Sequence, residues 1–327
     1  MAKQTYNRIY TPERWEKVNK YNKQLLDDYI LQIRSEGKSE KSIKQYYNDA
    51  RIILIYIMEE LDNKQLYRLN RKALRNFVLW MQDNGMSAAR INRMLSTTRN
   101  LFNFVAEDDD YEEDFEDCKV NPNRLKGLRK EKARDIIFLT NEEVMCIYNS
   151  LVKQERYSEA LLCAFLYDSS CRRNEAFQVT REDISIEANF TKNEVTGKRG
   201  KKFRLIYHQL TKEAYGLYME HRNDEEQHLW ETRHGGPAAY ETLYNQIVSW
   251  RKILLKEMGV EKEFNPHSFR HSSLNNYENG THYMCEKLGK RFTLQELQLL
   301  ANHSDISTTQ SYLEDKSTDK LLEAFGM

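Results

Sequence analysis

Apolar side chains in the first 106 residues recur at intervals of three and four, the period of an amphipathic helix. Pro12 follows Thr11 at a first helical position, and Gly37 supplies a stop signal. The pattern predicts helices over 12–36, from about residue 39, over 71–83 and from residue 87. Four helices with one apolar face each can bury those faces together, so we expect a compact helical bundle.

A second domain is predicted to open at Thr140, which is placed to form a capping box with Glu143. Helical periodicity continues over 156–180. Three short strands are then expected in "DISIEANF", "NEVTG" and "KKFRLIYH", the last two joined across "GKRGK". From Tyr240 onward the pattern is helical again. The expected fold class is mostly α (α+β), with a helical bundle followed by a mainly helical domain that holds one small antiparallel sheet.

The composition fits a soluble, helix-rich protein of two domains, because its 327 residues are 40% hydrophobic and 31% charged and include only 4 prolines. No run of eighteen apolar residues is present to span a membrane, and the N-terminal segment lacks the apolar stretch of a secretory signal. The five cysteines form no C-x-x-C pair. We therefore expect reduced thiols, no zinc site and a cytoplasmic location.

The formal net charge is zero, with 50 basic and 50 acidic residues, which is unexpected for a protein that binds nucleic acid. The charge is unevenly distributed, however. Segment 107–117 holds nine acids and no base, and without it the chain carries 50 bases against 41 acids, a net charge of +9. The next segment, 119–135, has seven bases and two acids. The neutral total thus conceals a basic stripe suited to a DNA duplex, although charge alone fits a solvated, flexible linker equally well.

Basic side chains are also predicted on the outward faces of two helices of the bundle. Such faces are usually only solvated, but together with a basic linker they form a candidate surface for a DNA groove. The candidate DNA-binding residues are Lys41, Lys44, Arg51, Arg90, Arg93, Arg99, Lys126, Arg129 and Lys130.

Four places in the second domain carry side chains suited to phosphate chemistry. An arginine near a helix start can bind a phosphate, a hairpin lysine can donate a proton, and a His-x-x-Arg pair lies on one helix face. In chain order these residues are Arg172, Lys198, His267 with Arg270, and His303 with Tyr312. Each alone also has an ordinary structural explanation, such as a helix cap, a surface ion pair, a turn lysine or a core tyrosine. Their order along the chain distinguishes them.

That order resembles the tyrosine recombinases, the phage integrase family, over nearly the whole chain. "SSCRRNEAFQVTREDI" resembles the first arginine box of the family, and "TGKRGKKFRLI" is similar to its hairpin lysine motif. "HSFRH" matches the His-x-x-Arg box, and "LLANHSDISTTQSY" resembles the final box. The matching residues are Arg172 with Glu175 as its supporting acid, Lys198, His267, Arg270, His303 and Tyr312. The resemblance implies a SAM-like core-binding domain over 1–118, a basic linker over 119–135 and a catalytic domain over 136–327.

The resemblance also implies a chemistry, in which a tyrosine attacks a DNA phosphate. Arg172 and Arg270 would stabilise the charge that develops on the phosphate, and the two histidines would bond it and assist proton transfer. Lys198 would protonate the departing 5′ oxygen, which leaves a 3′-phosphotyrosyl link on Tyr312. Because that link stores the bond energy, no metal, nucleotide or other cofactor is expected.

The implied partners are double-stranded DNA and further copies of the chain, with two protomers on a site and four in a synapse. A phage or other mobile element is the implied source, with action in the bacterial cytoplasm at the nucleoid and no membrane partner. The tail 315–327 has a short apolar pattern that either docks on a neighbouring protomer or packs on its own domain. No arm-binding domain is expected before residue 11, so the protein resembles the simpler recombinases.

Three departures from the family pattern keep other functions open. Ser170 and Asn302 stand where the family commonly has glycine, and segment 278–296 is longer than the usual connection, which could displace His303 and Tyr312. These features suit an alternative function as a DNA-binding transcriptional regulator, similar to a phage repressor, on a recombinase fold without strand exchange. A type IB topoisomerase would share the same chemistry.

Overall fold

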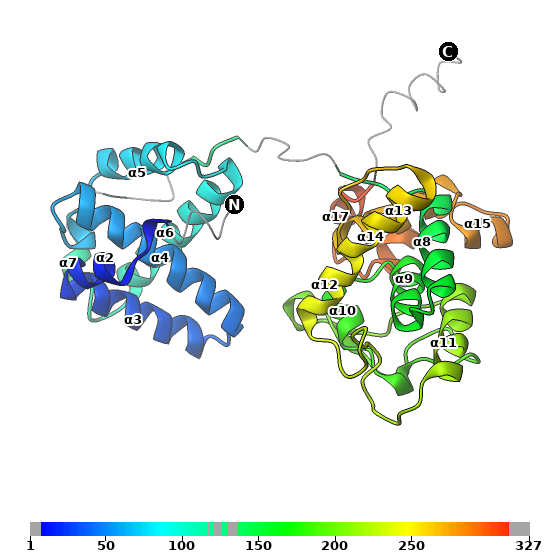
Figure 1. Cartoon of the computed structure of the whole chain (residues 1–327). Helices are drawn as coiled ribbons and strands as arrows, with labels where there is room; N and C mark the ends of the chain where they lie inside the picture. Colours follow the sequence, from blue (N-terminus) through cyan, green and yellow to red (C-terminus); the bar gives the residue numbers. More distant parts are fainter. Residues whose placement is uncertain (1–7, 117, 119, 121–125, 130–135, 314–327) are drawn as a thin grey trace, which may run out of the picture. The chain divides into compact units, whose positions relative to one another are not determined.

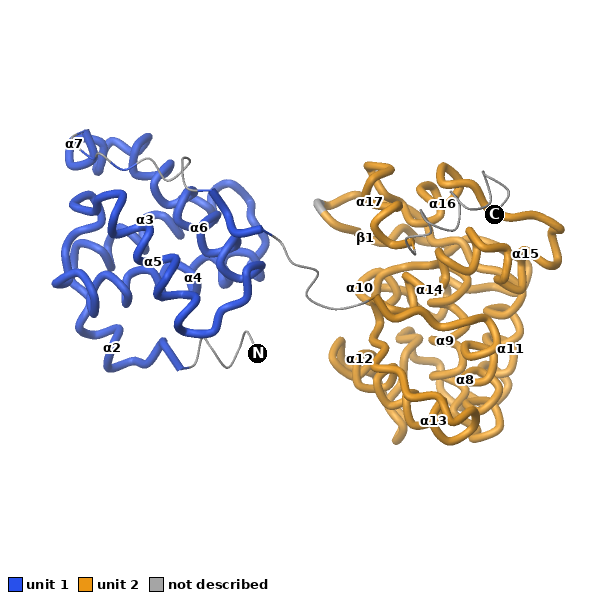
Figure 2. The backbone as a smooth tube through the Cα atoms, turned by 90° about the horizontal axis from the view of Figure 1, so that it is seen from above, with its two compact units in different colours: residues 1–133 blue, residues 134–327 orange. Residues whose placement is uncertain are grey.

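The computed structural model describes residues 8–116, 118, 120, 126–129 and 136–313. The chain divides into two compact units, residues 1–133 and residues 134–327 (Figure 2). Each unit has its own buried apolar core. Most of the predicted linker and the apolar tail lie outside the described residues. Within the described parts, no helix has the length and apolar character needed to cross a membrane.

The first unit is a helical bundle, drawn from blue to cyan in Figure 1. Its elements are α2 (Pro12–Lys17), α3 (Lys20–Ser35), α4 (Glu40–Glu60), the 3₁₀ helix η1 (Leu66–Arg68), α5 (Arg71–Asp83), α6 (Ala88–Glu107) and α7 (Glu112–Phe115). The side chains of Ser39, Asn70 and Ser87 each accept a backbone N–H at the start of α4, α5 and α6. The helix starts expected near residues 39, 71 and 87 are therefore confirmed.

The prediction of one continuous helix over 12–36 is wrong, because the chain leaves the helical conformation between α2 and α3. Val18 is extended, with φ −61° and ψ 135°. Asn19 then caps α3 by accepting the N–H of Asn22 at 2.8 Å, and its amide donates to the carbonyl of Asn63 at 2.7 Å. A hydrogen bond to a residue 44 positions away thus ends a helix that the local apolar pattern would continue.

Residues 107–116, the described part of the acidic segment, pack against the helices of the first unit. Two aromatic residues of this segment, Tyr111 and Phe115, are buried in the apolar core of the bundle. The hydroxyl of Tyr111 also donates to Asp28 of α3, and Tyr21 donates to Asp114 at 2.7 Å. The segment is therefore held by apolar burial as well as by hydrogen bonds.

The second unit is mainly helical. Its elements are α8 (Asn141–Lys153), α9 (Tyr157–Ser169), α10 (Arg173–Phe177), η3 (Arg181–Asp183), β1 (Val195–Thr196), η4 (Lys198–Gly200), β2 (Lys202–Phe203), α11 (Gln209–His221), α12 (Tyr240–Ser249), α13 (Arg251–Met258), α14 (Pro266–Asn279), α15 (Tyr283–Leu288), α16 (Leu294–Leu300) and α17 (Ile306–Gln310). The predicted capping box is confirmed, because Thr140 and Glu143 bond each other's backbone N–H groups at 2.9 and 3.2 Å.

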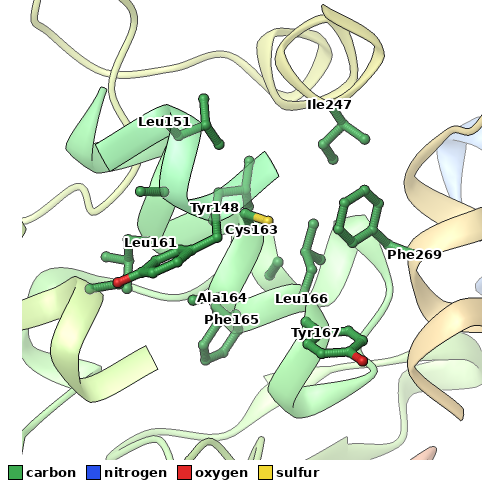
Figure 3. Close-up of a cluster of buried hydrophobic side chains, with 14 of the residues drawn as sticks. Tyr148, Leu151, Leu161, Cys163, Ala164, Phe165, Leu166, Tyr167, Ile247 and Phe269 are labelled. Carbon is green, nitrogen blue, oxygen red and sulfur yellow. The ribbon is translucent and has the colours of Figure 1, made fainter. Parts of the chain in front are cut away.

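Helix α9 forms the centre of the second core, since nearly all of its residues are buried whichever way they face. Figure 3 shows its side chains Leu161, Phe165 and Leu166 among residues of the surrounding helices, including Ile247 of α12 and Phe269 of α14. Burial of this central helix fixes its C-terminal end, from which the first arginine box continues.

The predicted sheet is smaller than expected. Strands β1 and β2 pair antiparallel, with Val195 opposite Phe203, but the first predicted strand contributes only an isolated bridge between Phe190 and Ile206. The side chain of Thr191 accepts the Leu205 N–H at 3.0 Å, so a hydroxyl replaces the backbone acceptor that a longer ladder would need. The prediction of a full strand in "DISIEANF" is therefore wrong, whereas the hairpin formed by the other two strands is confirmed.

Candidate active site

The first arginine box lies at the turn between α9 and α10. Arg172 caps α10 in an extended conformation, and its N–H donates to the Glu175 carboxylate at 2.7 Å. The same carboxylate accepts the Arg172 Nη1 at 2.8 Å and is 2% exposed. Although burial disfavours the charged form of Arg172, interactions with Glu175 and Tyr312 raise the pKa of this guanidinium above its ordinary value. A buried acid therefore orients the arginine and keeps it charged.

Arg270 of α14 joins three segments of the unit. Its side chain is 1% exposed, and it donates to the carbonyl oxygens of Ser170 and Ala301 and to Nε2 of His303, the last two at 2.6 and 2.7 Å. Its Nη1 also lies 3.8 Å from Glu175. Its Nε is buried and has no hydrogen-bond partner among the described residues. An unsatisfied buried donor is costly, and a phosphate oxygen is a group that would satisfy it.

Tyr312 is surrounded by imidazole rings and is 8% exposed. The centroid of its ring lies 5.0 Å from that of His267 and 5.0 Å from that of His303. His271 stacks on the ring at 4.3 Å, and Cζ of Arg270 lies 5.2 Å from the ring centroid. The structure thus brings His267, Arg270, His303 and Tyr312 together, with Arg172 close enough to interact with the phenol.

Both predicted histidines are neutral near pH 7. Desolvation, together with His271 and the two arginines, lowers the pKa of His267 to about 4, although its side chain still reaches solvent. Burial and the same arginines lower the pKa of His303 to about 3. Because Nε2 of His303 accepts from Arg270, its hydrogen lies on Nδ1, which donates to Thr309 at 3.0 Å.

The hairpin lysines Lys198 and Lys201 differ in their surroundings. Lys198 is exposed in η4 at the tip of the hairpin. Lys201 donates to the carbonyl of Asn302 at 3.3 Å, and its charge contributes to the low pKa of His303. Lys201 and His271 were not predicted from the sequence as residues of the site. Only their sequence positions could have identified them. Lys201 lies on the same hairpin as Lys198, and His271 lies one helical turn after His267.

The two expected glycine positions have the backbone conformation that favours glycine. Ser170 has φ 50° and Asn302 has φ 53°. A left-handed conformation costs a non-glycine residue about 1–2 kcal/mol, but the hydroxyl of Ser170 pairs with that of Ser273 at 2.6 Å. Segment 278–296 contains the short helix α15, and His303 and Tyr312 still reach Arg270. The longer segment therefore does not move His303 and Tyr312 away from Arg270.

The predicted exposed arginines of the first unit have internal partners. Arg93 donates twice to Asp49, at 2.9 and 3.0 Å, and Arg90 contacts the same buried carboxylate at 3.0 Å. With a side chain 12% exposed, Arg90 does not lie on an open face as predicted. Arg51 lies 4.0 Å from the ring centroid of Tyr47 and donates to its hydroxyl at 2.7 Å.

The remaining candidate DNA-binding residues differ in exposure. Lys41, Lys44, Lys126 and Arg129 are exposed, whereas Arg99 is half-buried. Lys130 lies outside the described residues. Metal-binding geometry is also not found, because no group of three or more His, Cys, Asp or Glu residues in the described parts could hold an ion.

Comparison with known proteins finds the same two-part organisation. Residues 137–318 match the phage integrase family, and residues 26–108 match the N-terminal SAM-like domain of phage integrases. The chain is 22% identical over 314 residues to the SPbeta prophage-derived recombinase-like protein YomM of Bacillus subtilis, covering 91% of this chain and 89% of that one. It is 24% identical to a tyrosine recombinase of Thermosipho africanus, covering 91% and 96% of the two chains.

Solved structures share the fold. The integrase of transposon Tn1549 in complex with transposon right end DNA aligns with a TM-score of 0.66 at 16% identity, over 93% of this chain and 99% of that one. A lambda integrase tetramer bound to a Holliday junction aligns with a TM-score of 0.66 at 18% identity, over 90% and 77% of the two chains.

Proposed function

Since this chain belongs to the phage integrase family, we propose that it is a site-specific DNA recombinase that cuts and rejoins DNA through a 3′-phosphotyrosyl intermediate. The observation that carries the proposal is the position of Tyr312, whose ring lies 5.0 Å from those of His267 and His303 and beside the guanidinium of Arg270. A nucleophile, two neutral hydrogen-bonding rings and two charged arginines are the groups that phosphoryl transfer from DNA to a tyrosine requires.

In the proposed reaction the phenolic oxygen of Tyr312 attacks the phosphorus, and the bond between phosphorus and the 5′ oxygen breaks. The neutral ring of His267 takes the phenolic proton, and Lys198 on the hairpin supplies a proton to the departing 5′ oxygen. Arg172 and Arg270 stabilise the charge on the non-bridging oxygens. Attack of another 5′-hydroxyl on the phosphotyrosine reverses these steps and completes strand exchange. No cofactor takes part in this scheme.

We propose double-stranded DNA and further copies of the chain as partners. The solved relatives include a lambda integrase dimer bound to a core site and the tetramer on a Holliday junction. By analogy, two protomers would occupy one site and four would form a synapse. In the first unit, the exposed residues Lys41, Lys44, Lys126 and Arg129 are the proposed contacts to DNA phosphates.

The regulator hypothesis is not favoured, because the geometry weakens the observations that suggested it. It depended on the loss of two glycines and on a displaced tyrosine. Ser170 and Asn302 adopt the left-handed conformation nonetheless, and Tyr312 packs beside Arg270. A type IB topoisomerase would relax plasmids without any specific site, whereas a recombinase acts only on its own sequence.

The proposal is tested with a nicked suicide substrate, built on DNA sites that the protein selects from a random pool. We expect a covalent protein–DNA adduct that, after proteolysis, maps to the peptide containing Tyr312. Scrambled DNA of the same length serves as the control and should give no adduct. Tight, sequence-specific binding without any adduct would instead support the regulator.

Binding is expected to weaken steeply with salt in spite of the zero net charge. Removing one phosphate contact should lower the slope of log K against log salt by about 1. The double variant Lys41→Ala/Lys44→Ala should therefore lower the slope by about 2, as measured by fluorescence anisotropy between 50 and 300 mM salt (roughly the range in which counterion release dominates). Lys72→Ala, at an exposed position on α5, is the control. An unchanged slope in the double variant would remove these lysines from the DNA surface.

A further inference from the structure

His271 makes two separate contacts with Tyr312. Its ring stacks on the phenol with centroids 4.3 Å apart and an interplanar angle of 25°. Its Nδ1 lies 2.9 Å from the backbone carbonyl oxygen of Tyr312, and because a carbonyl can only accept, Nδ1 carries the hydrogen. One imidazole therefore holds both the side chain and the backbone of the same residue.

The position of His271 is itself fixed. It lies on α14, one helical turn after His267, and is 9% exposed. The ring of His267 meets it edge-on at 4.9 Å, and Phe138 does so at 6.1 Å. Burial lowers the pKa of His271, which disfavours its charged form. In the neutral ring, the Tyr312 carbonyl holds the hydrogen on Nδ1.

Tyr312 lies two residues beyond the end of α17, and each of its backbone groups has a hydrogen-bond partner. Helix α17 ends at Gln310, and the N–H of Tyr312 donates to Thr309 at 2.9 Å. The Tyr312 carbonyl accepts a hydrogen bond from Nδ1 of His271. Together the two bonds fix both backbone groups of the tyrosine.

Building on the proposed function, we propose that His271 is a positioning residue, which holds Tyr312 with its phenol toward Arg172 and Arg270 before DNA binds. It acts through the tyrosine and needs no contact with the phosphate. A reacting group displaced by about 1 Å can lose about 10²-fold in rate. The two contacts of His271 with Tyr312 therefore affect the cleavage rate, whereas DNA affinity rests on contacts elsewhere.

The test measures the single-turnover rate of adduct formation on the suicide substrate for three variants. His271→Ala removes both contacts, and we expect a rate lower by about 10²-fold with the DNA affinity unchanged. His271→Phe keeps a stacking ring without the N–H, and His271→Asn keeps a donor in the place of Nδ1 without the ring. Each should recover part of the rate, and circular dichroism identifies any variant that does not fold.

The chain offers a matched control in His221. Its ring also lies against a tyrosine, Tyr157, with centroids 4.2 Å apart, and its Nδ1 lies 2.9 Å from the Leu217 carbonyl oxygen. His221→Ala removes the same kind of contacts away from the site and should leave the rate unchanged.

The pH dependence separates positioning from proton transfer. If His271 only positions the tyrosine, each variant lowers the rate by a constant factor across the pH range. A loss that varies with pH would assign His271 a role in proton transfer and overturn the proposal. A wild-type rate in folded His271→Ala would overturn the positioning role alone. Absence of any adduct in the wild type would overturn the proposed function, and the positioning role with it.

Discussion

The Tyr312→Phe variant is expected to form no covalent adduct with DNA while binding the same DNA with unchanged affinity. The substitution removes only the phenolic oxygen. The remaining ring keeps its stack on His271 and its place in the apolar cluster that includes Leu274 and Leu297, so the fold is retained. Affinity is retained as well, because it rests on many phosphate contacts. Denaturing electrophoresis of the nicked substrate measures the adduct, and gel shift measures the affinity.

Tyr244→Phe is the matched control, because it removes a hydroxyl from an exposed tyrosine of the same unit. An adduct that persists in Tyr312→Phe would remove Tyr312 as the nucleophile. Mixing Tyr312→Phe with Arg172→Ala extends the test. Since the arginines and the tyrosine meet within one unit, the mixture should not regain cleavage, and restored cleavage would show that the tyrosine comes from another copy.

The helices could be predicted from the sequence wherever their signals are local. Ser87, for example, bonds a backbone N–H three residues ahead, and apolar periodicity follows directly. The break after α2 could not be predicted, because Asn19 pairs with Asn63, which is distant in the sequence. The first of the three predicted strands could not be excluded from the sequence for a related reason, since the hydroxyl of Thr191 replaces a backbone acceptor for the distant Leu205.

The candidate site could be predicted as a set of residues but not as a geometry. Helical spacing places His267 and Arg270 on one face, and glycine-like positions anticipate the left-handed backbone of Ser170 and Asn302. No spacing rule indicates that Arg270 bonds the carbonyls of two other segments. Those bonds exist only once α9 and α16 pack beside α14, so they follow from the tertiary fold.

Charge on a helix face was an unreliable signal for an open basic surface. Arg90 and Arg93 were predicted on an open basic surface. Both instead bond Asp49, which lies on the buried side of α4. A carboxylate that is nearly fully buried attracts charged partners, because an unpaired buried charge is costly. The periodicity of a single helix does not reveal such a partner on its neighbour.

The Arg172→Ala variant is expected to cleave the suicide substrate at least about 10³-fold more slowly than the wild type, equivalent to about 4 kcal/mol of transition-state stabilisation. Its guanidinium is held by the buried carboxylate of Glu175 and interacts with Tyr312, so it is placed where charge develops during attack. DNA affinity should change little. Single-turnover cleavage and gel shift measure the two quantities separately.

Arg173, the next residue in the chain, provides the control for the loss of cleavage rate in Arg172→Ala. Arg173 lies at the same turn, but its guanidinium stacks on Tyr240 at 3.8 Å and pairs with Glu241. The two arginines are neighbours in sequence with similar partial burial, and only Arg172 is oriented by Glu175. Arg173→Ala should therefore cleave within a few-fold of the wild type. Equal losses in both variants would mean that positive charge at this turn matters and its orientation does not, which contradicts the role assigned to Glu175. Wild-type cleavage by Arg172→Ala would remove that arginine from the reaction.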